Sequence, residues 1–354
     1  MIKFTPTGQS KISSLDFNNI PFGQVFTDHL FQVDYKNGEW KNPEISELKP
    51  ISVHPGNLAW HYGQSIFEGM KAFKNKDGQP VLFRPELHIE RLNASARRMS
   101  MPDFPKDLFM EAVHSMVDIE RAWIPPTKGS ALYIRPVMVS MEVALGVRAS
   151  NEYKMMIMTL PVGPYYPKPV SLKTESKYVR AAMGGVGEAK TAGNYAASLL
   201  PAQKAKEAGF DQIMWLDAKE FKYVQEIGTM NIFFVIGDTV VTPITNGTIL
   251  KGITRMSAIA LLKDHGYKVE ERLIDIQEVV DAYRAGNLKE AFGAGTAALT
   301  SNVHLIQHGD VAMDLSNHKN EVSDFVKNSL NDLRFGDLED KYGWIVPVES
   351  SVAV

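Results

Sequence analysis

The chain has 354 residues, of which 44% are hydrophobic and 22% charged, and its formal net charge is −3. This composition is typical of a soluble globular enzyme. Charges of both signs are spread along the chain, so no basic stripe exists to bind nucleic-acid phosphates, and we expect no nucleic-acid partner. No segment has the apolar length of a membrane span or a signal peptide, which favours a cytoplasmic protein without a membrane partner.

Cysteine is absent from the sequence, which excludes disulfides, thiol nucleophiles and sulfur-ligated metals. The nine histidines show no His-Glu-x-x-His pair and no tight ligand spacing. We therefore expect no metal site.

The length predicts two domains. We expect a smaller N-terminal α+β domain over 1–160, an interdomain loop over 161–174 and a larger C-terminal α/β domain over 175–354, in an α/β (α+β) fold. In the first half, apolar patterns predict strands over 24–34, 81–83, 132–136 and 154–160. They also predict helices over 87–99, behind Pro85, and over 106–122.

The second half alternates strands and helices more densely. A helix is predicted from about 196 to a stop at Gly209, and strands over 212–216, 231–236 and 239–243, the last two joined by a Gly237-Asp238 turn. A helix over 254–265, a strand over 267–274 and a helix ending at Gly286 follow. The segment 161–169 concentrates proline and glycine, and it suits either a plain linker or a lid that carries Tyr165 and Tyr166.

Lys190 lies in a glycine-rich run that reads Met183-Gly-Gly-Val-Gly-Glu-Ala-Lys-Thr-Ala-Gly-Asn-Tyr195. Two chemistries fit a lysine in this setting. Residues 184–191 nearly match a phosphate-binding loop, but Ala189 replaces the glycine before the lysine, which argues against a nucleotide site. The other is a Schiff-base lysine, whose amine condenses with an aldehyde cofactor. A solvated loop lysine is the ordinary alternative.

Two further glycine-marked turns could hold an anion. Gly252 precedes Ile253 and Thr254 at a predicted helix N-terminus, where unpaired amides bind phosphate. The run Phe292-Gly-Ala-Gly-Thr296 permits close backbone approach and adds a hydroxyl donor. A structural turn or helix cap is the ordinary explanation of each motif taken alone.

Two charged residues complete the candidate constellation. Glu226, before an apolar strand, could pair with a cationic ring nitrogen, or could be a solvated strand-edge carboxylate. Arg91 could bind a phosphate through its two-pronged guanidinium, or could be a surface arginine.

Six motifs in order make the chain resemble the branched-chain amino-acid aminotransferases of the fold-type IV pyridoxal-phosphate family. They are Tyr62-Gly-Gln-Ser-Ile-Phe-Glu-Gly-Met-Lys-Ala-Phe73, Leu82-Phe-Arg-Pro85, Tyr133-Ile-Arg-Pro136, the run that contains Lys190, Glu226-Ile-Gly-Thr-Met-Asn231 and Phe292-Gly-Ala-Gly-Thr-Ala297. The resemblance spans nearly the whole chain. It implies reversible transfer of the amino group of leucine, isoleucine or valine to 2-oxoglutarate, which gives the 2-oxo acid and glutamate.

The resemblance also implies roles for individual residues. Lys190 would bind pyridoxal 5'-phosphate covalently and shuttle a proton, with a pKa lowered by burial and a nearby cation. Tyr195 would contact the ring hydroxyl and Glu226 the ring nitrogen. The phosphate would be bound by Arg91, Ile253, Thr254 and Thr296.

The substrate residues follow by the same resemblance. Thr229 and Ala297 would hold the substrate α-carboxylate, and Tyr62, Phe67 and Tyr165 would form an apolar side-chain pocket. Tyr133 would also be a substrate residue. Leu145 and Val147 would come from a neighbouring subunit, which implies a homodimer. Arg135 would accept the side-chain carboxylate of glutamate, with a structural ion pair as the alternative role.

Some members of the family have a Cys-x-x-Cys pair after the phosphate-binding threonine, where this chain has Ala298 and Ser301, which excludes thiol redox control of that kind. The nearest rival activities are D-amino-acid transamination and aminodeoxychorismate lyase chemistry on the same fold. From other classes, an ATP-dependent kinase and an inactive binding protein remain as alternatives.

Overall fold

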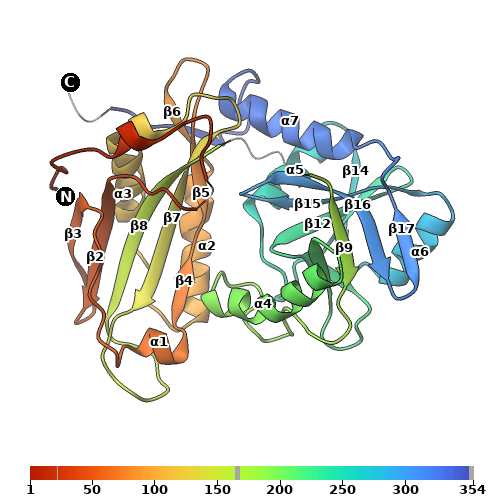
Figure 1. Cartoon of the computed structure of the whole chain (residues 1–354), viewed down its shortest axis with the longest axis horizontal. Helices are drawn as coiled ribbons and strands as arrows, with labels where there is room; N and C mark the ends of the chain where they lie inside the picture. The colour runs from red at the N-terminus through yellow and green to blue at the C-terminus, as the bar shows by residue number, and fades with distance from the viewer. Residues whose placement is uncertain (22, 164–167, 351–354) are drawn as a thin grey trace. The chain divides into compact units, whose positions relative to one another are not determined.

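The computed structural model describes residues 1–21, 23–163 and 168–350 of the chain. The chain forms two compact units (Figure 1). Unit 1 comprises Met1–Tyr165, Ala189–Gly193 and Asn331–Val354, and unit 2 comprises Tyr166–Glu188 and Asn194–Leu330. Unit 1 therefore takes up a short central segment and the C-terminal segment of the chain. The domain boundaries at 160 and 175 remain a prediction.

Unit 1 is built on one nine-stranded sheet in the order β1-β3-β2-β8-β7-β5-β6-β18, with β4 paired to β7. Its strands are β1 (Lys3–Phe4), β2 (His29–Lys36), β3 (Glu39–Glu47), β4 (Ser65–Phe67), β5 (Met70–Lys74), β6 (Pro80–Phe83), β7 (Ala131–Ser140), β8 (Tyr153–Val162) and β18 (Ile345–Pro347). The long pair β7–β8 runs antiparallel in register over all ten residues of each strand. Side chains alternate between the two faces, so one face of the sheet can be buried while the other carries functional groups.

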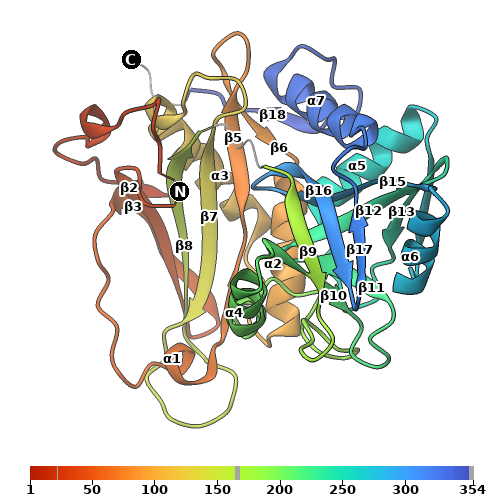
Figure 2. The same cartoon turned by 45° about the vertical axis from the view of Figure 1, so that its right-hand side comes forward.

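Helices α2 (Pro85–Arg98) and α3 (Lys106–Ile119) pack on this sheet, as Figure 2 shows, while the short α1 (Leu58–Tyr62) leads into β4. In α2, Pro85 occupies the first turn and two arginines occupy the last, as the helix dipole favours. Its apolar positions Ile89, Leu92 and Ala96 recur at helical spacing and join the core.

Unit 2 contains a second nine-stranded sheet, in the order β11-β10-β9-β16-β15-β12-β13-β14 with β17 on β16. Its strands are β9 (Val170–Thr174), β10 (Gln212–Leu216), β11 (Val224–Ile227), β12 (Met230–Ile236), β13 (Thr239–Pro243), β14 (Lys268–Arg272), β15 (Leu288–Gly295), β16 (Leu299–His308) and β17 (Val311–Asp314). Strand β11 also pairs with β12, so β11, β10, β9, β16, β15 and β12 form a closed ring. None of the strands in this ring has a free edge.

The helices that follow these strands are α4 (Ala192–Glu207), α5 (Ile253–Asp264), α6 (Ile276–Arg284) and α7 (Glu321–Phe335). Helix α5 contacts β14 and β15, and α6 contacts β15 and β17. The apolar core of this unit includes Phe234 and Val241 from the sheet and Val279 and Val280 from α6. Among the described residues, no helix is long and apolar enough to cross a membrane.

Most of the predicted elements are confirmed, including β10, β13 and the Gly237-Asp238 hairpin turn. The helix predicted over 106–122 is too long, since α3 ends at Ile119 and a 3-10 turn covers Arg121–Trp123. The helix predicted from 196 begins earlier, at Ala192. The glycines of 292–295 form the end of strand β15, so the prediction of a turn after a strand is wrong there.

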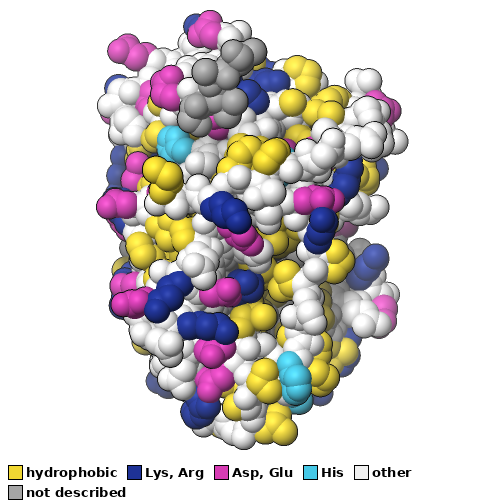
Figure 3. Space-filling model, turned by 90° about the vertical axis from the view of Figure 1, so that its left-hand side faces the viewer, with side chains coloured by type: hydrophobic (Ala, Val, Ile, Leu, Met, Phe, Trp, Pro, Cys, Tyr) yellow, Lys and Arg dark blue, Asp and Glu magenta, His cyan; other side chains and the backbone are white. Residues whose placement is uncertain are grey.

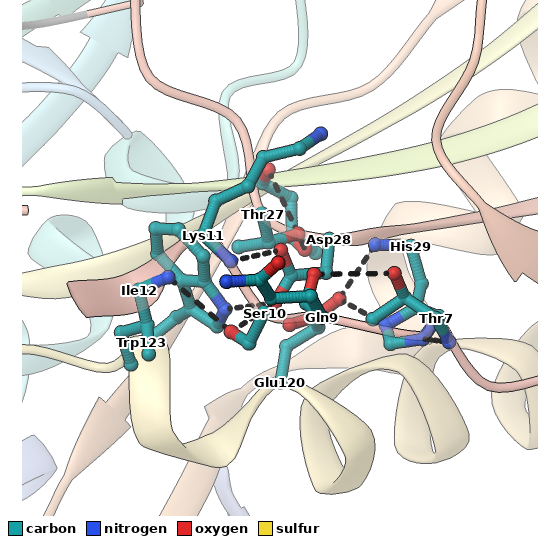
Figure 4. Close-up of polar contacts among 11 residues, drawn as sticks. Thr7, Gln9, Ser10, Lys11, Ile12, Thr27, Asp28, His29, Glu120 and Trp123 are labelled. Carbon is teal, nitrogen blue, oxygen red and sulfur yellow. Dashed lines mark hydrogen bonds and ion pairs between the residues drawn. The ribbon is translucent and has the colours of Figure 1, made fainter. Parts of the chain in front are cut away.

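The strand predicted over 24–34 begins only at His29, and the carboxylate of the preceding Asp28 binds distant parts of the chain (Figure 4). The Asp28 carboxylate accepts hydrogen bonds from Lys11 N–H at 2.9 Å and Trp123 Nε1–H at 3.1 Å, as well as from Ser10 Oγ. Thr27 donates its N–H to the Thr159 carbonyl. Lys11 and Trp123 lie 17 and 95 positions from Asp28 in the sequence, so periodicity alone does not reveal these contacts.

The face of the molecule in Figure 3 carries basic and acidic side chains interspersed with apolar ones. The strands of unit 1 carry such pairs: Lys36 lies 3.3 Å from Glu152, and Lys154 lies 2.7 Å from Asp34. These surface pairs contribute little individually, typically about 0–1 kcal/mol.

Candidate active site

Lys190 is fixed by its backbone to two elements of unit 1. Its N–H donates to Ser95 Oγ of α2 at 2.9 Å, and its carbonyl accepts from the Phe67 N–H of β4 at 3.0 Å. The next residue, Thr191, donates its hydroxyl to the Ser65 carbonyl at 2.8 Å. The chain around the lysine is therefore anchored to a sheet and a helix, as a reactive side chain requires.

The Lys190 amine lies 4.6 Å from the centre of the Phe67 ring. Burial of the amine lowers its pKa from 10.5 to about 8, and the positive charges of Arg91 and Arg135 act in the same direction, against a raising effect of Glu68 and Tyr133. This agrees with the prediction of a lysine whose pKa is lowered by burial and a nearby cation. At neutral pH an appreciable fraction of such an amine is neutral and nucleophilic.

Arg91 binds the buried carboxylate of Glu68 with two parallel hydrogen bonds, from Nε at 2.7 Å and from a terminal nitrogen at 2.8 Å. His88 Nδ1 lies 2.8 Å from the same carboxylate. Although burial alone would raise the pKa of Glu68, the charge and hydrogen bonds of Arg91 and His88 hold it well below its usual range. The predicted phosphate ligand Arg91 is thus held rigidly by a partner that the sequence did not assign.

Tyr133 and Arg135 lie two residues apart on β7, so they share one face of the sheet with Phe67. Arg135 donates to the Tyr133 hydroxyl at 3.0 Å, and its guanidinium carbon lies 4.8 Å from the Phe67 ring centre. Its Nε is buried without a hydrogen-bond partner among the described residues. Gly69 makes room for this cluster, because a Cβ there would lie 2.1 Å from the Tyr133 hydroxyl.

Glu226 of unit 2 is fully buried on β11 and pairs with Arg180 Nε at 2.7 Å. Its other oxygen accepts from Leu250 N–H at 2.8 Å and from Asn231 Nδ2 at 3.3 Å. The carboxylate is therefore fixed from three directions. The alternative of a solvated strand-edge carboxylate is wrong.

Ile253 and Thr254 form the first turn of α5, directly behind the Gly252 cap. A Cβ at Gly252 would lie 2.0 Å from Asn231 Oδ1, so glycine alone lets the helix N-terminus approach β12 this closely. Asn231 is also a neighbour of Glu226. The structure thus brings the predicted helix-end anion site and the predicted ring-nitrogen ligand together within unit 2.

Thr296 and Ala297 follow the last residue of β15, and Thr229 lies in the turn between β11 and β12. The strand ends that adjoin these two loops are close, because a Cβ at Gly295 would lie 3.2 Å from Met230 Cγ. Tyr195 is half-buried in the first turn of α4. Its role as a cofactor ligand remains a prediction, as do the roles of Thr229, Thr296 and Ala297.

Three of the predicted substrate residues lie on the surface of unit 1. Tyr62 ends α1, and Leu145 and Val147 lie in the loop that follows β7, with 73% and 88% of their surface exposed. The loop is joined to the α1 region by the hydrogen bond from Ala144 N–H to the Gly56 carbonyl. Tyr165, and with it the tip of the predicted lid, lies outside the described residues.

The phosphate-loop alternative for 184–191 lacks its structural context. Such a loop connects a strand directly to a helix. Here the preceding strand β9 ends at Thr174, well before the glycines. Gly187 instead serves close packing, since a Cβ there would lie 2.5 Å from the Thr248 carbonyl oxygen.

Comparison with known proteins identifies the family. The family model for amino-transferase class IV matches residues 65–306. The chain belongs to the class IV aminotransferases. Branched-chain-amino-acid transaminase 1 of Bacillus subtilis (strain 168) is 46% identical to it over 339 residues, 94% of this chain and 95% of that protein. Branched-chain-amino-acid aminotransferase of Mycolicibacterium smegmatis is 41% identical over 337 residues, 92% of each chain.

Solved structures support the same assignment for this aminotransferase. The branched-chain amino acid aminotransferase of Escherichia coli is 27% identical, with a TM-score of 0.73 over 91% of this chain and 99% of that chain. The T.th. enzyme of the same name, complexed with N-(5'-phosphopyridoxyl)-L-glutamate, is 26% identical, with a TM-score of 0.73 over 90% of this chain and 98% of that chain. The predicted α/β fold of a fold-type IV enzyme is confirmed.

Three residues that position the site of this aminotransferase were not predicted from its sequence. Glu68 and His88 fix Arg91, and Arg180 fixes Glu226. One signal was available: Glu68 is the one charged residue in the short run Ile66–Met70, whose other members are apolar residues or glycine, and a carboxylate at such a position must find a cation. Arg180 lies in an irregular loop, where no periodicity marks a residue as buried.

Proposed function

We propose that the chain is a branched-chain amino-acid aminotransferase, which transfers the amino group of leucine, isoleucine or valine to 2-oxoglutarate. The observation that carries the proposal is the buried Lys190 amine, whose pKa is lowered to about 8, in a chain of the class IV family. The names of relatives more than 40% identical over nine-tenths of the chain support the choice of substrate.

The chain's own residues fit pyridoxal 5'-phosphate by chemistry. Lys190 offers an amine to an aldehyde, the first turn of α5 offers N–H groups and a hydroxyl to a phosphate, and the buried Glu226 offers an anion to a protonated ring nitrogen. When bound, the cofactor supplies an aldehyde that takes up the amino group and a ring that accepts electrons from the substrate α-carbon.

Each residue then has a definite task. Lys190 acts first as the nucleophile and then as the base that removes a proton from the substrate α-carbon, for which a pKa near 8 is well matched. Arg180 pairs with Glu226 and orients its carboxylate, because its Nε lies 2.7 Å from one carboxylate oxygen. Glu68 orients Arg91, which we propose as a phosphate ligand.

We propose that Arg135 lets one apolar site accept both leucine and glutamate. It lies against the Phe67 and Tyr133 rings, and its buried Nε has no partner among the described residues. An aliphatic side chain can pack on the two rings, whereas the carboxylate of glutamate requires a cation because burial of an unpaired charge is costly.

We propose that the enzyme is a homodimer in which Leu145 and Val147 contribute to the partner's substrate site. An exposed apolar patch comprising Trp60, Tyr62, Val143, Leu145 and Val147 supports this. Patches of this kind mark contact surfaces more often than free surface. Free amino acids and 2-oxo acids are metabolites of the cytoplasm, where we propose that the enzyme acts.

The decisive experiment combines activity with covalent attachment. Protein incubated with pyridoxal phosphate is treated with borohydride and digested, and mass spectrometry should find the added mass on the peptide that contains Lys190. Formation of glutamate from leucine and 2-oxoglutarate should require this residue, so Lys190→Ala should abolish the reaction. The control Lys222→Ala, at the surface of unit 2, should leave the reaction unchanged. Attachment without transfer from leucine, or no attachment, would refute the proposal.

A further inference from the structure

The sequence contains two Asn-Gly pairs, Asn37-Gly38 and Asn246-Gly247. An asparagine followed by glycine can lose its side-chain amide, because glycine has no Cβ to keep its peptide nitrogen away from the asparagine carbonyl carbon. Both asparagines are exposed, so water reaches each of them. Whether either pair reacts therefore depends on its local structure.

The amide oxygen of Asn246 is held by two donors of one residue. Thr248 donates its hydroxyl to Asn246 Oδ1 at 2.7 Å and its N–H to the same oxygen at 3.4 Å. A backbone N–H can only donate, so the amide atom that faces it is the oxygen. Two donors on a carbonyl oxygen stabilise the negative charge that develops there when a nucleophile attacks the carbonyl carbon.

The nucleophile is the peptide nitrogen of Gly247. The hydrogen bond between Thr248 N–H and Asn246 Oδ1 closes a small ring that contains both Asn246 Cγ and the Gly247 nitrogen, which keeps these two atoms near each other. The Gly247 N–H donates no hydrogen bond to the described residues. Its φ of 96° favours glycine, and no atom lies within 4 Å of the position that a Cβ would take.

The pair Asn37-Gly38 has a different setting. It forms the two-residue turn of the β2–β3 hairpin, between the paired residues Lys36 and Glu39. The strands on both sides fix the backbone of such a turn. No donor among the described residues holds the Asn37 amide oxygen. The folded protein should therefore favour reaction at Asn246 over reaction at Asn37.

We propose that Asn246 is a site of spontaneous deamidation, which Thr248 promotes. The Gly247 nitrogen forms a bond to Asn246 Cγ and gives up its proton to solvent. The Cγ–Nδ2 bond then breaks, and the amide nitrogen takes a proton from solvent and leaves as ammonia, so that a cyclic imide remains. Water adds to one of the two imide carbonyls and opens the ring to aspartate or isoaspartate. No oxidant or further reactant is required.

This modification changes the loop that supports Glu226. The loop joins β13 to α5, and it supplies the Leu250 N–H to Glu226 at 2.8 Å and the Thr248 carbonyl to Arg180 at 2.9 Å. Either product adds a negative charge at residue 246, and isoaspartate also inserts an extra carbon into the main chain. The conversion therefore loosens the loop. Neither the reaction nor this effect depends on the proposed transamination.

Mass spectrometry of the full-length protein tests the reaction. The protein is aged in mildly alkaline buffer with pyridoxal phosphate present, and heavy-oxygen water marks the residues converted during the incubation. In the folded protein Asn246 should convert at least about fivefold faster than Asn37, as expected from one hydrogen bond to the reacting oxygen. In guanidinium chloride the two rates should be similar, because the flanking structure is lost. Equal rates in the folded protein, or a faster rate at Asn37, would overturn the proposal.

Two variants test the part of Thr248. Thr248→Val removes the hydroxyl and should slow conversion of Asn246 about fivefold, while Asn37 in the same molecules keeps its rate. The control Thr245→Val removes a hydroxyl on the other side of Asn246 and should change neither rate. If Thr248→Val fails to fold, the comparison of folded and unfolded wild-type protein still decides the matter. An unchanged rate at Asn246 in folded Thr248→Val contradicts the role of Thr248.

Limited proteolysis tests the effect on the loop. The converted protein carries an additional negative charge, so anion exchange separates it from the unconverted form. Trypsin should cleave the converted form faster after Lys251, an exposed residue of the same loop. Cleavage after Lys319, an exposed lysine that precedes α7, is the control and should be the same in both forms. Equal cleavage of the two forms after Lys251 would mean that the modification leaves the loop intact, contrary to the proposal.

Discussion

Arg91 and Glu68 form a bidentate ion pair inside unit 1, with N···O distances of 2.7 and 2.8 Å. The carboxylate is fully buried, and Glu68 directly follows Phe67, the last residue of β4. Such a pair is costly to break from one side, because the remaining charge stays buried without its partner. It therefore restricts the geometry of the guanidinium that we propose for phosphate binding.

The first prediction concerns Glu68→Gln. The substitution should destabilise the protein by about 3–5 kcal/mol, because it leaves the Arg91 charge uncompensated. It should also lower the pKa of Lys190 further, since the Glu68 carboxylate raises it. Urea unfolding followed by tryptophan fluorescence measures the first effect, and the pH-dependent labelling described next measures the second.

Glu120→Gln is the matched control. Glu120 is equally buried in unit 1 and accepts hydrogen bonds from the N–H and Nδ1 of His29, at 2.8 and 2.7 Å, so it pairs with a histidine where Glu68 pairs with an arginine (Figure 4). We expect a smaller loss of stability and no change at Lys190. If both substitutions changed the pKa of Lys190 equally, the effect of Glu68 on this lysine would not depend on its place beside Arg91.

The second prediction is that Lys190 in cofactor-free protein reacts as an amine with a pKa near 8. Below this pH the amine is protonated and unreactive, and above it the neutral form dominates, so acylation by acetic anhydride should rise with a midpoint near pH 8. Mass spectrometry of the Lys190 peptide gives the rate. The denatured protein, labelled in parallel, should show the ordinary lysine midpoint near 10.5, and a native midpoint equal to it would contradict the burial effect.

The sequence predicted the reactive groups of the site better than it predicted the residues that hold those groups in place. Lys190, Glu226 and the α5 N-terminus stand out because glycines or helix-start signals flank them. Those signals are local, so a single chain reveals them. The contacts Ser95–Lys190 and Arg180–Glu226 join residues 95 and 46 positions apart, and no local pattern reports them.

The fold likewise contains elements that depend on contacts between distant parts of the chain and were therefore missed. Strand β16 (Leu299–His308) and helix α7 were not predicted, although both are long. In β16, polar residues such as Asn302, His304 and Gln307 interrupt the apolar pattern. The strand forms backbone hydrogen bonds with its neighbours β9 and β17. Strand formation there depends on tertiary pairing more than on intrinsic preference.

The third prediction separates the two substrates by Arg135→Met. The substitution removes the guanidinium but keeps an apolar side chain against Phe67. The kcat/KM for 2-oxoglutarate should fall about 30–100-fold, as expected for loss of a charge-assisted hydrogen bond of about 2–3 kcal/mol. The value for leucine should change less than about threefold. Equal losses for both substrates would favour a structural role instead.

The fourth prediction concerns Gly69→Ala. The new methyl group would lie 2.1 Å from the Tyr133 hydroxyl, so the ring must move and carry the hydrogen-bonded Arg135 with it. We expect a larger KM for both substrates, and loss of stability of about 1–3 kcal/mol from overpacking. Gly8→Ala is the control, because no atom lies within 4 Å of the position that a Cβ would take there. Unchanged kinetics in Gly69→Ala would mean that Tyr133 does not line the substrate site.

The last prediction is a pH dependence of stability that arises from Lys71. This lysine lies opposite Tyr133 in the sheet, and burial together with the positive charge of Arg334 lowers its pKa from 10.5 to about 7. Between these values the unfolded chain binds more protons than the folded one, so the free energy of unfolding gains a contribution that rises with pH from about 7 to 10.5. Lys71→Met should therefore stabilise the protein most at pH 6, by about 2–4 kcal/mol, and hardly at all near pH 10.5.

Urea unfolding at both pH values measures this gain in stability. The control is Lys219→Met, which replaces an exposed lysine of unit 2 and should leave the free energy of unfolding unchanged at both pH values. A gain that is the same at both pH values would show that Lys71 is not held in its neutral form, because only the titration of this amine makes the benefit of its removal depend on pH.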